Sequence, residues 1–321
     1  MTSNYYDLAL RWAPIDYQYI RLNKNPQSYE TKKDLLCAVN LDCYPNSTSE
    51  ECWNTENIRE RLRKTLIENL TPVCYYAVSE TDSHYFILYS FYHADDDTHP
   101  NDMEGCMIIL EKIENGELLL GMITIAHLDF WKYSYDNNLL KSSGEQFSPD
   151  EYLETDDDVD GEHPLIQQEE GKHGLYALGT HINIGTKIVR WFLAVLNKSP
   201  DVIVYYPGKK ATMYSAKRLK KGKKTPYDPS FYYELVDIFD SEQGLWERWK
   251  KRPNNTFDKD GKLHGGSANP PWLWKPGLSH SSDDALGMLW TNPASLVKDL
   301  FRPGIGRKEF SQRYITTWPS V

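Results

Sequence analysis

The chain has 321 residues, of which 40% are hydrophobic and 26% charged, a composition typical of a globular protein with a substantial core and not of a disordered chain. The formal net charge of −10 argues against nucleic acid as a partner. The first residues show no basic stretch followed by an apolar one, and no run is long and apolar enough for a transmembrane segment. We therefore expect a cytoplasmic protein, with secretion by a route without a signal peptide left open.

The first predicted elements are a strand and a helix. The stretch 5–20 predicts a strand, and this strand ends at Pro14. The polar segment 23–55 predicts an irregular lead-in. In residues 56–70 apolar side chains recur every four positions from Ile58, which predicts a helix.

Four apolar runs with short connections follow, in residues 73–79, 85–92, 105–113 and 117–127. The dipeptide Asn115-Gly116 between the last two is a strong hairpin signal. Consecutive strands joined by short links favour antiparallel pairing. The sequence therefore predicts a mostly β fold with peripheral helices, an antiparallel β-sandwich.

The second half of the chain is less regular. Shorter apolar runs predict strands in residues 175–178 and 202–206, and helices are predicted in 229–251 and 293–301. We expect a β-sandwich core in residues 1–206. Residues 207–321 are expected to form a basic loop and a helical or coil extension packed on the same domain.

The five cysteines form no C-x-x-C pair. Cys74 and Cys106 lie in strand-like runs, which predicts buried thiols. One disulfide among Cys37, Cys43 and Cys52 is left open. An odd number of cysteines without a signal peptide favours reduced thiols.

The connection between the strands 85–92 and 105–113 concentrates groups that bind cations. They are Asp95, Asp96, Asp97, His99, Asp102 and Glu104. Carboxylates suit Mg²⁺ or Ca²⁺, and an added imidazole extends the choice to Mn²⁺, Fe²⁺ or Zn²⁺. Asp102 and Glu104 stand two residues apart on a strand and therefore point to one face. The alternative is a polar turn with solvated acids.

Two further segments carry histidines. His127 and Asp129 end the fourth strand on one face, and His173 lies between glycines. Either histidine can act as a general base or orient a neighbouring group, and Asp129 is a catalytic candidate beside His127. The alternative for His127 is a hydrogen-bonded histidine at a strand end.

The segment 208–224 is strongly basic. Its cations include Lys209, Lys210, Lys217, Arg218, Lys220 and Lys221. One interpretation is a flexible solvated loop, and the other is a surface for an anionic membrane, a phosphate or nucleic acid.

The segment from His99 to Gly105 resembles the G-H-R-H-D-W-E-G signature of the necrosis-and-ethylene-inducing cytolysins, with Asn101 at the second histidine. A closer resemblance is to the family named for vacuolar protein sorting-associated protein 62. Its motifs are matched by Trp12-Ala13-Pro14, the same His99 segment, Ala126 to Phe130 and His163 to Tyr176.

These resemblances imply a β-sandwich with a divalent cation held by Asp95, His99, Asp102 and Glu104. The expected cation is Mg²⁺ or Ca²⁺, with Mn²⁺ as an alternative. In the cytolysins the cation helps to engage sugar head groups, so we expect a polar small molecule, a glycan or a lipid head group as the partner.

Three functions follow from this reading. The first is cation-dependent binding of a glycan, phosphate or lipid head group. The alternative is a metal-dependent hydrolase, in which His127 or His173 is the general base for a metal-activated water. The second alternative is a structural or sorting protein whose metal ties loops together.

Overall fold

The structure is a computed structural model. It describes residues 5–44, 49–126, 129–141, 155–156, 162–179, 201–220, 230–251, 255–265, 270–274, 287–303 and 308–318.

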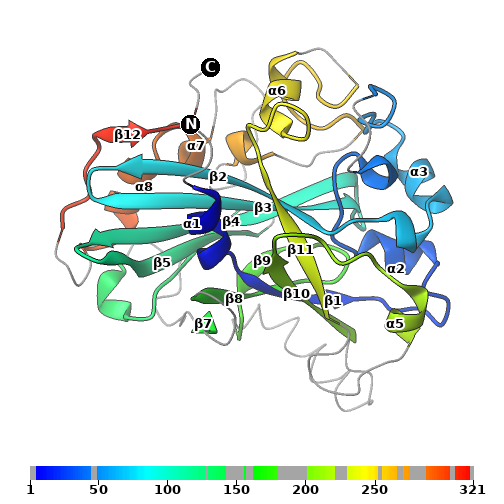
Figure 1. The fold of residues 1–321 in the computed structure, drawn as a ribbon, viewed down its shortest axis with the longest axis horizontal. Helices are drawn as coiled ribbons and strands as arrows, with labels where there is room; N and C mark the ends of the chain where they lie inside the picture. The colour runs from blue at the N-terminus through cyan, green and yellow to red at the C-terminus, as the bar shows by residue number, and fades with distance from the viewer. Residues whose placement is uncertain are drawn as a thin grey trace.

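One part of the sheet is a run of consecutive antiparallel strands (Figure 1). Its strands are β2 (Val73–Thr81), β3 (His84–Asp95), β4 (Pro100–Ile113), β5 (Gly116–Ala126) and β6 (Asp129–Tyr133). The register Ile113↔Gly116 leaves Glu114 and Asn115 as a two-residue loop, and Gly116 has φ +136°. The antiparallel strands and the hairpin predicted for residues 73–127 are therefore confirmed.

The other part of the sheet is mixed. Its strands are β1 (Ile15–Ile20), β7 (Thr155–Asp156), β8 (His163–Gln168), β9 (Leu175–Ala177), β10 (Asp201–Gly208) and β11 (Ser230–Asp237). β11 pairs in parallel with both β10 and β2, and β1 pairs in parallel with β8. The full order is β6-β5-β4-β3-β2-β11-β10-β1-β8-β7, with β9 beside β8 and β12 (Tyr314–Thr316) beside β2.

The sheet curls until its two ends approach each other. The rings of Trp131 on β6 and Tyr176 on β9 meet edge to face, 5.5 Å apart. The fold is thus mostly β with peripheral helices, as expected. However, it is a nearly barrel-shaped mixed sheet, and three parallel pairings distinguish it from the predicted antiparallel sandwich.

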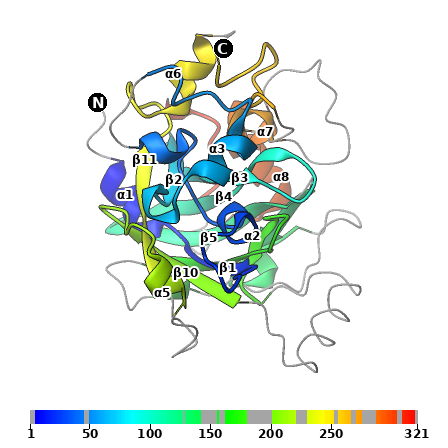
Figure 2. The ribbon, with the colours of Figure 1, turned by 90° about the vertical axis from the view of Figure 1, so that its right-hand side faces the viewer.

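The helices are short and lie outside the sheet. They are α1 (Tyr6–Trp12), α2 (Tyr29–Lys33), α3 (Ile58–Lys64), α5 (Ala216–Lys220), α6 (Leu245–Lys250), α7 (Met288–Thr291) and α8 (Pro293–Leu300). Single 3-10 turns are η1 (Leu41–Cys43), η2 (Ile67–Asn69), η3 (Asn137–Leu139) and η4 (Pro271–Leu273). Figure 2 views the molecule from the end at which α2 and α3 lie.

Two elements differ from their predictions. Residues 6–12 form α1, and only Ile15–Ile20 is a strand, because Ala13 before Pro14 must adopt an extended backbone that ends the helix. The apolar run around Leu235 is the strand β11, and only Leu245–Lys250 is helical. The residues around Leu235 are apolar because β11 lies inside the sheet, between β10 and β2, where the core-facing side chains have little access to solvent.

A cluster of tryptophans from the second half of the chain covers one face of the sheet. Trp246 and Trp290 stack at 4.9 Å, and Trp318 stacks on Trp290 at 5.1 Å. Trp274 packs so closely on β4 that a Cβ at Gly105 would lie 2.4 Å from its ring. The glycine of the His99–Gly105 motif thus allows this contact.

The part of the chain after residue 206 also contributes to the sheet itself. The proposed boundary at residue 206 falls inside β10, and β11 is paired on both sides. Residues 207–321 are therefore more than an extension packed on a finished core.

The cysteines separate into two groups. Cys43 and Cys52 form a disulfide, whereas Cys37, Cys74 and Cys106 are buried free thiols. The buried thiols of Cys74 and Cys106 are as predicted, and the disulfide left open by the sequence is the one between Cys43 and Cys52. Such a bond persists in an oxidising environment. The cytoplasmic location stays a prediction.

Candidate functional site

The hairpin from β3 to β4 carries the predicted cation ligands. Asp95 ends β3 and pairs with Pro100 at the start of β4. In the turn, the Asp96 carboxylate accepts hydrogen bonds from the Thr98 hydroxyl and the His99 backbone amide, each at 2.8 Å. Asp96 therefore shapes the turn, which is a role of aspartate in such connections.

Asp95 is held by the two helices at this end of the molecule. Its Oδ1 forms an ion pair of 2.6 Å with Arg59 Nε on α3, and its Oδ2 accepts a hydrogen bond from the Tyr29 hydroxyl on α2. The side chain is 3% exposed. The negative charge of Asp95 is therefore compensated by a guanidinium.

Asp102 and Glu104 lie on one face of β4, as the sequence predicts. Their antiparallel partners on β3 are His93 and Phe91, and the Phe91 ring meets Tyr233 of β11 edge to face. This face is thus the interior of the curled sheet. Both acids are almost fully buried there, at 5% and 6% exposure.

His99 lies at the edge of this interior. Its Nδ1 is 3.1 Å from the carbonyl oxygen of Asn101, and its Nε2 is 3.6 Å from Asp96 Oδ2. Asn101 adopts a left-handed φ of +57°, and its buried amide donates to the carbonyl oxygens of Thr55 and His264. Asn101, which stands at the second histidine of the cytolysin signature, is therefore a structural residue that anchors the bend.

His173 reaches Asp102 from the turn between β8 and β9. The His173 Nδ1 is 2.9 Å from Asp102 Oδ2, and its Nε2 is 3.6 Å from Asp34 Oδ1. The backbone supports this position, because His173 has φ +55° and Gly171 donates its amide to Asp34. The imidazole is fully buried between two carboxylates.

These carboxylates determine the charge of His173. Burial alone would lower its pKa, but the hydrogen bond to Asp102 and the negative charges of Asp102 and Asp34 raise the pKa to about 9. The side chain is therefore an imidazolium at neutral pH. A general base needs a neutral imidazole within reach of its substrate, so this environment does not support the predicted catalytic role of His173.

His93 is the neutral partner of this cation. Its ring stacks on His173 with centroids 3.9 Å apart, and burial together with the His173 charge lowers its pKa well below the usual value. Its Nε2 lies 2.7 Å from Gln18 Nε2 on β1. When the Gln18 amide donates this bond, the imidazole proton of His93 is on Nδ1.

The interior around these histidines contains polar atoms that have no hydrogen-bond partner among the described residues. They are both carboxylate oxygens of Asp16, Gln18 Oε1, His93 Nδ1 and Gln168 Oε1. Burial raises the pKa of Asp16 well above its usual value, and the charge of His173 opposes this effect. Unpaired buried polar groups are rare in proteins, and their presence points to a bound polar species.

The rim of the site is a network of charged side chains that range from buried to partly exposed. Asp97 pairs with Arg21 at 2.8 Å and with Lys33 at 2.6 Å, while Arg21 also contacts the buried Asp34 at 3.3 Å. On the other side, Lys172 Nζ lies 2.9 Å from the Thr98 hydroxyl. Positively and negatively charged side chains therefore lie on the rim near His99.

Sequence reasoning did not find Arg59, Asp34, His93 or Asp16. Asp16 and Gln18 stand two residues apart on the strand Ile15–Ile20, and His93 stands two residues before Asp95 on β3, so each pair shares one face. Arg59 and Asp34 come from other elements, and nothing local marks them.

In this structure the four predicted ligands are not arranged around a common point at which one cation could be coordinated. Within the described ranges, no group of three or more His, Cys, Asp or Glu side chains is arranged to hold a metal ion. Asp95 is neutralised by Arg59 and Asp102 by His173. A cation held by these residues would have to replace those partners, so we derive no step through a metal.

The remaining predicted site residues are only partly described. His127 lies outside the described residues. Asp129 pairs with Ala126 at the start of β6, but its side chain is not described. Their catalytic roles therefore stay predictions.

The basic segment is also only partly described. Lys209, Lys210 and Lys217 are exposed, whereas the Arg218 guanidinium lies over the Phe231 ring at 4.8 Å. The Lys220 side chain and Lys221 lie outside the described residues. In the part of the chain that is described, no helix is long and apolar enough to cross a bilayer.

No protein-family model matches the sequence, and a comparison with curated proteins found no match. Three solved structures are similar in part. One is necrosis and ethylene inducing protein 2 from the causal agent of cocoa's witches' broom disease, with 16% identity over 35% of this chain and 48% of that chain and a TM-score of 0.24. NLPPya in complex with mannosamine has 14% identity over 63% of this chain and 61% of that chain, with a TM-score of 0.28. A structure described as a toxin fold as basis for microbial attack and plant defense has 15% identity over 50% of this chain and 73% of that chain, with a TM-score of 0.23.

These neighbours belong to the same class of toxins that the His99–Gly105 motif resembles. The chain spans about half the length of the first neighbour and less than two thirds of the second. TM-scores of this size do not establish a shared fold, and they carry no argument about function. Nothing in the comparisons supports the vacuolar sorting family.

Proposed function

We propose that this protein binds a polar ligand, such as a glycan, a phosphate or a lipid head group, at the end of the sheet where Asp102 and His173 meet. The observation that carries the proposal is the ion pair of 2.9 Å between these residues inside the curled sheet. A buried imidazolium holds the carboxylate in one orientation. Such a fixed acceptor favours recognition, because little conformational freedom is lost on binding.

The interior and the rim supply complementary contacts. The unpaired polar atoms of Asp16, Gln18 and His93 provide acceptors and a donor inside, and the exposed groups around His99 provide both charges at the surface. Hydroxyl-rich ligands need donors and acceptors of this kind in fixed positions. The burial of the interior atoms requires the ligand to enter from the rim, or to reach them through bound water.

The hydrolase alternative is supported less well. It needs a neutral base. Burial lowers the pKa of His173, but Asp102 and Asp34 outweigh this effect and raise the pKa to about 9. Catalysis therefore depends on His127 alone among the predicted histidines. The divalent cation is retained as a proposal of its own, because Asp102 and Glu104 offer hard oxygen ligands on one face.

Binding is tested by calorimetric titration with glucosamine and mannosamine, each with Mg²⁺, with Ca²⁺ and with EDTA. Asp102→Asn is expected to weaken binding about tenfold or more, because it removes a charged acceptor. Asp82→Asn is the control, since Asp82 lies at the opposite end of the β2–β3 hairpin.

Four results are decisive. Binding that EDTA abolishes supports the cation-dependent form, and binding that EDTA leaves unchanged supports direct recognition. Equal losses in Asp102→Asn and Asp82→Asn contradict a site at Asp102. Release of a cleaved product from a glycoside or phosphate ester contradicts the preference for binding over hydrolysis.

A further inference from the structure

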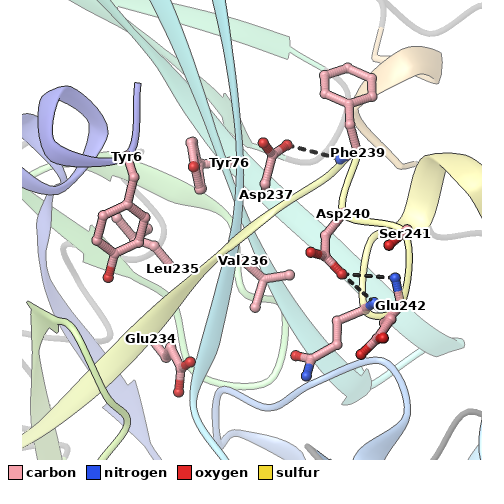
Figure 3. Close-up of a pocket in the computed structure, with 11 residues that line it drawn as sticks. Tyr6, Tyr76, Glu234, Leu235, Val236, Asp237, Phe239, Asp240, Ser241 and Glu242 are labelled. Carbon is pink, nitrogen blue, oxygen red and sulfur yellow. Dashed lines mark hydrogen bonds between the residues drawn. The ribbon is translucent and has the colours of Figure 1, made fainter. Parts of the chain in front are cut away.

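A pocket of about 570 Å³ opens between α1, β2, β11 and the turn that precedes α6 (Figure 3). Its ionisable side chains are the carboxylates of Glu234, Asp237, Asp240 and Glu242 and the phenols of Tyr6 and Tyr76. None of these residues belongs to the site around His173. The pocket is large enough for a small organic molecule.

The pocket is negatively charged. Among the described residues that line it there is no Lys, Arg or His. None of its four carboxylates forms an ion pair within the described part of the chain. Burial and the neighbouring Asp240 raise the pKa of Asp237, which indicates that the negative charges are close enough to repel.

The backbone holds two of these carboxylates in place. Asp237 accepts a hydrogen bond of 2.9 Å from the Phe239 amide (Figure 3). Asp240 accepts from the amides of Glu242 and Gln243, each at 2.8 Å. These backbone hydrogen bonds fix the orientation of the Asp237 and Asp240 carboxylates at the pocket, although Asp240 is exposed to solvent.

The second feature of the pocket is its aromatic wall. Tyr76 is 4% exposed and lines the pocket beside Asp237, and its hydroxyl has no hydrogen-bond partner among the described residues. The Tyr6 ring meets the Tyr76 ring edge to face, 6.3 Å away. The Tyr76 hydroxyl is therefore not committed to another described residue and can exchange a hydrogen bond with a ligand in the pocket.

We propose that this pocket binds a small organic cation that carries an ammonium group. Carboxylates attract the charge and accept its hydrogen bonds, and phenol rings stabilise it by cation–π contact. The cavity is much larger than a metal ion, and its tyrosines suit the carbon skeleton of an organic cation. This inference does not depend on the function proposed for the site at Asp102.

The test uses the full chain and two probes of the same length, putrescine and its neutral counterpart butanediol. Calorimetric titration at low ionic strength is expected to detect putrescine and not butanediol. Asp237→Asn and Glu234→Gln are each expected to weaken putrescine binding about tenfold. Tyr76→Phe removes only the hydroxyl and is expected to weaken binding by a smaller factor, with unchanged circular dichroism.

Two controls make the result specific. Glu56→Gln removes one exposed negative charge outside the pocket and is expected to leave the putrescine Kd unchanged. Asp102→Asn is likewise expected to have no effect, which separates this pocket from the site at His173. Equal binding of butanediol, an equal loss in Glu56→Gln, or no binding of putrescine would overturn the proposal.

Discussion

His173 Nδ1 lies 2.9 Å from Asp102 Oδ2, although the two residues are 71 positions apart in the chain. The contact joins the turn after β8 to the first residues of β4 across the interior of the sheet. It converts a residue that the sequence offers as a base into a fixed cation.

The first prediction concerns pH. Because the pKa of His173 is raised from 6.5 to about 9, its charge contributes stability that is complete below about pH 6.5 and is lost as the pH rises through about 9. The loss in the free energy of unfolding is roughly 3 kcal/mol at most. Urea unfolding between these pH values measures it.

The matched variants of this experiment are Asp102→Asn and Asp82→Asn. Asp102→Asn removes the acceptor that raises the pKa, so its stability is expected to depend less on pH over this range. Asp82→Asn is expected to keep the wild-type dependence. A wild-type stability that does not fall between pH 6.5 and 9 would contradict a charged His173.

The second prediction concerns Asp16. Both of its carboxylate oxygens are buried without a described partner, and burial raises its pKa well above 3.8. In the unfolded chain Asp16 ionises near its ordinary pKa of 3.8. Stability is therefore lost as the pH rises from 3.8 towards the raised pKa of Asp16 in the folded protein. Asp16→Asn avoids this loss. At pH 7 the free energy of unfolding of the variant is expected to be about 1–3 kcal/mol higher than that of the wild type, so the variant unfolds at a higher urea concentration.

The gain from Asp16→Asn should grow between pH 4 and pH 7, because it reflects the cost of a buried acid that tends to ionise. The same denaturation series at several pH values tests this directly. If the variant is less stable than the wild type throughout, Asp16 has a partner that stabilises its charged form. A gain in stability with a loss of ligand affinity would identify Asp16 as a residue kept for binding.

The third prediction concerns metal binding. Arg59 neutralises Asp95 at 2.6 Å, so Arg59→Gln frees a carboxylate at the end of β3. We expect this variant to bind Mg²⁺ or Ca²⁺ about tenfold more tightly than the wild type, because the cation no longer competes with a guanidinium. Metal analysis after gel filtration and calorimetric titration provide the measurement.

Asp102→Ala and Glu104→Ala are the reverse test of the same site. Each is expected to abolish uptake of the divalent cation, because each removes one oxygen ligand from the inner face of β4. Unchanged metal content in both variants would exclude a cation between these residues. An unchanged affinity in Arg59→Gln would exclude Asp95 from the ligands.

The fourth prediction concerns the disulfide. Cys43 and Cys52 are nine residues apart, and a bond that closes a loop of this length stabilises a protein by about 2–3 kcal/mol. Dithiothreitol is therefore expected to lower the free energy of unfolding by about this amount. The double variant Cys43→Ser and Cys52→Ser should match the reduced protein and show no response to the reductant.

A stability that dithiothreitol does not change would contradict this disulfide in the folded protein. Cys37→Ser serves as the control, because Cys37 is a buried free thiol and its variant should keep the full response to reduction. Mass spectrometry of the alkylated peptides identifies the paired residues.

Much of the antiparallel sheet follows from local pattern. The runs that became β2 to β5 are apolar because their strands are buried, and Asn115-Gly116 suits the tight turn between the last two. The helix α8 was also predictable, because Pro293 occupies its first turn and Asn292 caps it. These features depend on neighbours close in sequence.

Other elements could not be predicted because their neighbours are distant. The apolar residues around Leu235 are compatible with a helix or a buried strand, and only the pairing of β11 with β10 and β2 decides between them. The same pairing makes the sheet mixed. Likewise, nothing near Cys43 in the sequence distinguishes Cys52 from Cys37 as its partner.

The spacing of Asp102 and Glu104 is enough to place their side chains on one face of β4, because side chains alternate along a strand. Which charges lie opposite these acids depends on residues that are distant in the chain. Arg59 reaches Asp95 from α3, and His173 reaches Asp102 from the turn after β8. Coulombic pairing depends on the distance between two charges in space, and the folding of the whole sheet determines that distance.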